Sequence, residues 1–83
     1  MSTANNLSTR ELVQVTANCS HIITEGEQNP NYRAAVLEAA AAARIVISRL
    51  GAEPPTKNAV TRQGNALLRK SMSRCVALAA SLP

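Results

Sequence analysis

Apolar residues between positions 31 and 50 follow the period of an α-helix on two sides of the same segment. The first row steps alternately by four and three residues, as in a heptad seam, and consists of Tyr32, Val36, Ala39, Ala43, Val46 and Leu50. A second row steps by four through Leu37, Ala41 and Ile45. At about 100° per residue it points roughly away from the first. Since a helix in a small monomer needs only one apolar face, the pattern predicts a helix that is covered on both sides.

The segment before it, residues 8–25, has the pattern of an amphipathic helix with a defined start. Ser8 and Glu11 fit a capping box, and Leu7 with Leu12 fits the hydrophobic staple that accompanies it. One arc of this segment is apolar and the opposite arc is polar, with Gly26 as the stop. This arrangement predicts a helix with one buried side.

The other two helices are bounded by proline, glycine and capping residues. Asn29 is the expected cap of the middle helix, with Pro30 at its first position and Gly51 at its end. Thr56 is the expected cap of the third helix. Its predicted inner arc contains Val60, Leu67, Leu68, Met72, Cys75, Val76, Leu78 and Ala79. Gly64 lies on that arc and indicates either a close helix approach or a later helix start.

Short connectors between these segments predict antiparallel neighbours. The expected fold is all-α, a three-helix up-down-up bundle in a single domain over residues 1–83. A flexible segment 1–7 precedes helices at about 8–25, 30–50 and 57–81. The chain has no Phe, no Trp and one Tyr, so its core consists of small aliphatic side chains and buries little apolar area. Association would bury more apolar area, and we therefore expect a helical dimer.

The charge is unevenly distributed along the chain. The net charge is +4, but residues 54–83 contain five basic residues and no acidic one. Four of the basic residues share the polar arc of the third helix: Arg62, Arg69, Lys70 and Arg74. This face is suited to an anionic partner such as nucleic acid, or it is simply a solvated face. This face has no aromatic residue for base stacking. The chain has no Trp or Phe for a membrane interface, so no membrane partner is expected.

Catalytic and metal-binding patterns are missing. His21 lies on the polar arc of the first helix without a nucleophile placed near it, and we expect a surface histidine. Cys19 and Cys75 lie on apolar arcs and are expected to be buried free thiols. A zinc site needs about four ligands, and these three side chains are too few. We therefore expect a non-enzyme without cofactor or metal.

No secretory or membrane-spanning segment is evident, so we expect this protein in the cytoplasm.

The second apolar row on the middle helix is the main functional indication. Leu37, Ala41 and Ile45, with Arg33 and Arg44 beside them, form the expected contact with a second copy or with another protein. The sequence thus predicts a small adaptor or inhibitor that binds and modulates another protein, of a kind that phages and other mobile elements also carry. Three alternatives stay open, one of which is that the chain is a subunit of a larger enzyme whose chemistry lies elsewhere. The other two concern this chain's own surfaces. The first or third helix covers this row within a monomer, or the chain binds nucleic acid through the basic face.

Overall fold

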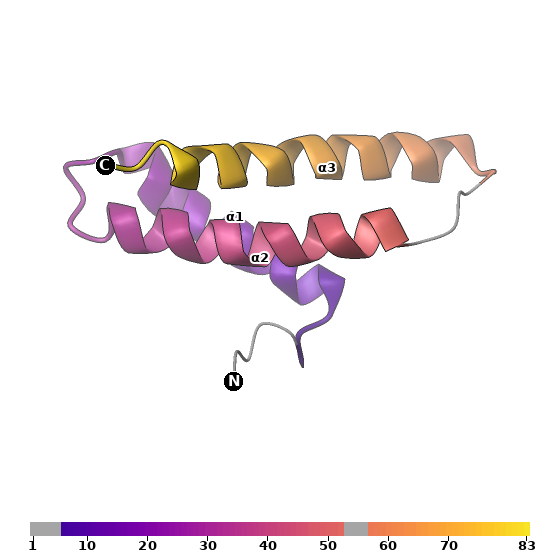
Figure 1. The fold of residues 1–83 in the computed structure, drawn as a ribbon, viewed down its shortest axis with the longest axis horizontal. Coiled ribbons are helices and arrows are strands. Elements are labelled where there is room, and N and C mark those ends of the chain that lie inside the picture. Colours follow the sequence, from indigo (N-terminus) through magenta and orange to yellow (C-terminus); the bar gives the residue numbers. More distant parts are fainter. Residues whose placement is uncertain (1–5, 53–56) are drawn as a thin grey trace.

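A computed structural model describes residues 6–52 and 57–83 of the chain, and this part is all-α. It contains α1 (Thr9–Glu25), α2 (Tyr32–Ala52) and α3 (Ala59–Ala80), packed as a helical bundle (Figure 1). The all-α, three-helix prediction is therefore confirmed. The helix bounds differ from the expected ones by one to two residues at five of the six ends. Most of the segment expected to be flexible, residues 1–5, lies outside the described residues.

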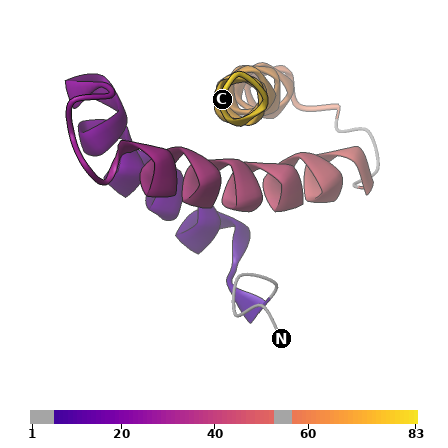
Figure 2. The same cartoon turned by 60° about the vertical axis from the view of Figure 1, so that its left-hand side comes forward.

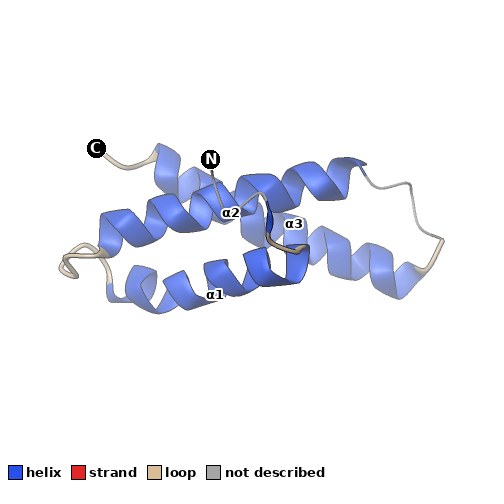
Figure 3. Cartoon of the chain, turned by 90° about the horizontal axis from the view of Figure 1, so that it is seen from below, coloured by secondary structure: helices blue, strands red, loops and turns tan. Residues whose placement is uncertain are grey.

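The middle helix holds the bundle together. α2 packs against both α1 and α3, whereas α1 and α3 contact each other far less. Figure 2 shows α3 end-on beside α2, which lies lengthwise, so α3 crosses α2 at a wide angle, with α1 on another side of α2. Figure 3 shows α1 and α2 side by side. The radius of gyration is 13.4 Å, above the roughly 12 Å expected for a compact chain of this length. The larger radius goes with an elongated shape, whose principal extents are 44 × 28 × 20 Å. Parts of the apolar faces of α2 and α3 stay exposed, at Leu37 and Leu67 for example.

Two adjoining groups of buried side chains make up the core. One is centred on Leu12 of α1, Val46 of α2 and Met72 of α3, and the other on Cys19, Ala35 and Ala39. Cys75 of α3 packs against both groups. The contact residues of α2 are largely alanines, which allow helices to approach closely.

The predicted start of α1 is confirmed in detail. The backbone N–H of Glu11 donates to Ser8 Oγ at 3.1 Å, and the backbone N–H of Ser8 donates to Glu11 Oε1 at 3.0 Å. Leu7 packs against the core group that contains Leu12, as the staple requires. At the other end Gly26 has φ 85° and ψ −169°, a conformation that is essentially restricted to glycine. A defined stop therefore separates α1 from α2.

The start of α2 differs from the expected one. Asn29 does not cap the helix, because its Oδ1 accepts a hydrogen bond from the backbone N–H of Asn31 at 2.8 Å. This i to i+2 bond forms a turn that holds Pro30 ahead of the helix, which begins at Tyr32. The far end runs through Gly51 to Ala52, so Gly51 does not end the helix.

The start of α3 also differs. The cap is Asn58, whose Oδ1 accepts from the backbone N–H of Thr61 at 3.0 Å, and the predicted cap Thr56 lies outside the described residues. Gly64 lies inside the helix, exposed, and a Cβ built on it meets no atom within 4 Å. Gly64 therefore marks neither a close approach of two helices within the bundle nor a later start of α3.

Two arginines of α2 join the helix ends. Arg49 Nη1 donates to Thr9 Oγ1 at 3.2 Å, which connects the end of α2 to the start of α1. Arg33 Nη1 donates to the carbonyl oxygen of Pro83 at 2.8 Å, which connects the start of α2 to the segment after α3. Both flanking helices are thus held at one end by a hydrogen bond.

Candidate interaction surface

The buried side of α2 is wider than the heptad seam alone. Of the predicted seam, Tyr32 is half-buried and the other five residues are buried. Ala35 and Ala42 extend the buried arc on one side and Ala40 extends it on the other. This wide arc accommodates two helices, one toward each edge. Single-sequence patterning misses such flanking alanines because their hydrophobicity is low.

The second apolar row faces away from this arc and is open in large part. The side chain of Leu37 is 46% exposed, and Ala41 is exposed. Ile45 is half-buried and packs against the core group around Leu12 and Val46. Neither α1 nor α3 covers the first two residues. We call Leu37, Ala41 and Ile45 the α2 stripe.

The two arginines expected beside the stripe have different surroundings. Arg33 is exposed and is held by its bond to Pro83. Arg44 is exposed, and it forms no ion pair within residues 6–52 and 57–83. The carboxylate of Glu38, the residue after Leu37, lies on the other side of the stripe. The stripe therefore has a polar border of both signs, as protein interfaces commonly do.

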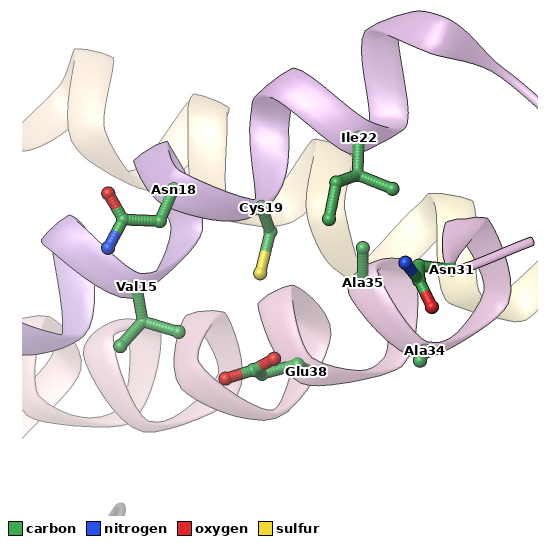
Figure 4. A pocket seen from close by; sticks show the side chains of 8 residues that line it. All are labelled: Val15, Asn18, Cys19, Ile22, Asn31, Ala34, Ala35 and Glu38. Atoms are coloured by element: carbon green, nitrogen blue, oxygen red, sulfur yellow. The ribbon is translucent and has the colours of Figure 1, made fainter. Parts of the chain in front are cut away.

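A hollow of about 360 Å³ adjoins this side of the molecule between α1 and α2. Figure 4 shows side chains from both helices around it, and its lining consists of Val15, Asn18, Cys19, Ile22, Asn31, Ala34, Ala35 and Glu38. Ala34 and Glu38 come from the same side of α2 as the stripe. The hollow extends the apolar surface at this side by a shallow depression.

The apolar arc predicted for the third helix is only partly buried. Met72 is buried, and Leu68, Cys75, Val76 and Ala79 are half-buried. The remaining large members are exposed: Val60 at 80%, Leu67 at 61% and Leu78 at 37%. Their assignment to the core was wrong because the arc is wider than one neighbouring helix can cover. A helical wheel shows that this arc is too wide for one neighbouring helix, and this is the sequence signal that could have separated the exposed members from the buried ones.

The four cations of the predicted basic face do not form a single stripe. All are exposed, and none forms an ion pair with another residue that the structure describes. Arg62 and Arg69 are seven residues apart and share one side of α3, and Lys70 and Arg74 are four apart and share another. The two pairs are centred about 110° apart around the helix axis, and their nearest members, Arg62 and Lys70, are about 80° apart. An extended anionic ligand therefore meets two of them at a time on either side.

The two cysteine thiols are shielded from solvent to different degrees. Cys19 is buried, Cys75 is half-buried, and both are free. Burial raises the pKa of Cys19, with the nearby Glu38 carboxylate adding to the effect, and burial also raises the pKa of Cys75. Protonated thiols are poor nucleophiles and poor metal ligands. His21 is exposed, and the described residues contain no group of three or more potential metal ligands.

Comparison of the chain with protein-family models, with curated proteins and with solved structures found no match. No helix in the described part is long and apolar enough to cross a membrane.

Proposed function

We propose that this protein is a non-enzymatic interaction module that forms a dimer through the α2 stripe and acts as a small adaptor or inhibitor of another protein. The observation that carries the proposal is the exposure of Leu37, at 46%, on a helix whose opposite side already buries five of its six seam residues. Free thiols at Cys19 and Cys75 are compatible with a reducing compartment such as the cytoplasm.

The order of side chains along the stripe supports self-association. Large, small and large residues follow one another at four-residue steps, so the stripe reads the same in both directions. A second copy running antiparallel about a two-fold axis at Ala41 places Leu37 against Ile45 of that copy. The small side chain at position 41 lets the two helix axes come within about 8 Å at the crossing point.

Sedimentation equilibrium of wild type and two matched variants tests this proposal. Leu37→Glu places a charge in the stripe, and Leu67→Glu places the same charge on an exposed leucine of α3. We expect Leu37→Glu to weaken dimer formation by at least about tenfold, since half a leucine side chain loses its burial and a carboxylate would be desolvated.

The control variant is expected to dimerise like the wild type. Both variants should keep the far-UV circular dichroism of the wild type, because both leucines are exposed. A monomeric wild type, or equal weakening by the two substitutions, would contradict the proposal. Ile45→Glu is a poor test because Ile45 also packs against the core.

Nucleic-acid binding is the second candidate, and the exposed cations of α3 support it. Electrostatic binding of this kind falls steeply with salt, with a slope set by the number of phosphates contacted. A gel-shift titration at several salt concentrations checks it. Absence of binding to duplex and single-stranded DNA and RNA at low salt would remove this candidate.

A further inference from the structure

We propose that α3 carries a second docking surface, which accepts an acidic amphipathic helix of another protein. Three of the four large apolar side chains that the described residues leave exposed belong to α3, namely Val60, Leu67 and Leu78. Their spacings of 7 and 11 residues bring them to within about 20° of one another around the helix. We call these three residues the α3 apolar row. It is separate from the α2 stripe and does not depend on dimer formation.

The row has the length and shape that a partner helix needs. From Val60 to Leu78 it extends over 18 residues, or about 27 Å along the axis. Gly64, between Val60 and Leu67, and Ser71, between Leu67 and Leu78, lie close to the same line, and both are exposed. The open space beside Gly64 lets a partner side chain approach the backbone. The small residues at 64 and 71 thus leave room beside the large ones for the apolar side chains of an amphipathic helix.

The charge beside the row indicates what kind of helix it accepts. Arg74 follows Leu67 by seven residues and lies almost in line with it, and Lys70 lies one turn from both. Neither cation forms an ion pair with any part of the chain that the structure describes. Since α3 contains no acidic residue, both cations are available to acidic side chains of a partner. Acidic residues beside an apolar seam complement this surface.

A second copy of the chain is a worse occupant than an acidic partner. The midpoint between Val60 and Leu78 is position 69, so in an antiparallel pair of α3 helices Lys70 of each copy lies on the same edge near the two-fold axis. A parallel pair in register places Arg74 near Arg74 of the second copy. Either arrangement adds like charges and neutralises none.

Nucleic acid does not account for the row. Phosphates interact with Arg and Lys and make no use of three exposed aliphatic side chains. Arg62 and Arg69, which would serve phosphates equally well, lie on the far side of α3 from the row. A helix with an apolar seam and acidic flanks is the occupant that uses both the leucines and the nearby cations.

Two synthetic peptides provide the test. Both are 21 residues long with leucine at the seam positions of three heptads. One has glutamate and the other has lysine at the flanking positions, so that like charges prevent each peptide from associating with itself. Binding of each labelled peptide to the full chain is followed by fluorescence anisotropy. We expect the glutamate peptide to bind, and Leu67→Glu to weaken that binding by at least about tenfold.

Charge reversal sharpens the test. The double variant Lys70→Glu, Arg74→Glu should lose the glutamate peptide and gain the lysine peptide. The matched variant Arg62→Glu, Arg69→Glu should bind like wild type, and Leu37→Glu should lose the dimer and keep the peptide. The proposal is overturned if the glutamate peptide does not bind, or if the two double variants bind it alike. It is also overturned if a 20-nucleotide RNA displaces the glutamate peptide and both double variants weaken that RNA binding equally.

Discussion

Single residues at the ends of the helices fix where the chain turns. Ser8 and Glu11 exchange hydrogen bonds at the start of α1, and Gly26 ends it in a conformation that other residues rarely adopt. These features could be read from the sequence, because capping chemistry is local. The caps of α2 and α3 could not, since Asn29 is a better turn former than cap in front of Pro30, and Asn58 takes the place expected for Thr56.

The capping box gives a prediction for stability. Ser8→Ala removes the acceptor of the Glu11 backbone N–H and should lower the free energy of unfolding by about 1 kcal/mol, measured by urea denaturation at pH 7. An unchanged midpoint of denaturation would show that the box is not formed.

The same box predicts a pH dependence. The backbone N–H of Ser8 holds the pKa of the Glu11 carboxyl below its ordinary value of 4.5. A depressed pKa stabilises the folded chain above the unfolded value, and this stabilisation is lost as the pH falls through the folded value. The stability difference between wild type and Glu11→Ala should therefore narrow between pH 5 and pH 2. A constant difference would contradict this assignment.

At the scale of the element, α2 is an alanine-lined helix that accepts a neighbour on each side of its seam. The heptad seam was predictable because its period is regular, and five of its six residues are buried. The burial of Ala35, Ala40 and Ala42 was not predictable from a hydrophobic pattern, since alanine is common on both buried and exposed faces of helices. Close packing of helices is what buries them.

A pair of alanine substitutions checks this close packing. Ala43 is fully buried between the helices, so Ala43→Leu should overpack the contact and lower the free energy of unfolding by about 1–3 kcal/mol. Ala66→Leu, at an exposed position of α3, should leave stability nearly unchanged. The measurement is urea denaturation of both variants at one protein concentration. Equal free energies of unfolding for the two variants would mean that the helices at Ala43 are farther apart than in the structure.

At the scale of the whole molecule, the bundle is open because α1 and α3 pack on α2 and hardly on each other. The number of helices followed from the sequence, and so did the reversal of chain direction from each helix to the next (Figure 1). The amount of each apolar arc that stays exposed did not, because it depends on how far apart α1 and α3 sit around α2. This is why Val60, Leu67 and Leu78 were expected in the core, and why Ile45 is more buried than its place in the α2 stripe suggested.

The proposed dimer is tested most directly by a cysteine at its two-fold axis. Helix axes about 8–10 Å apart place the two Cα atoms of residue 41 roughly 3–5 Å apart, which overlaps the range that a disulfide spans. Ala41→Cys and the control Ala17→Cys, which is exposed on α1, are made in a chain carrying Cys19→Ala and Cys75→Ala. Under mild oxidation at micromolar concentration, the account predicts a covalent dimer for Ala41→Cys and a monomer for Ala17→Cys on a non-reducing gel. Equal cross-linking of the two variants, or none in either, would contradict association through the α2 stripe.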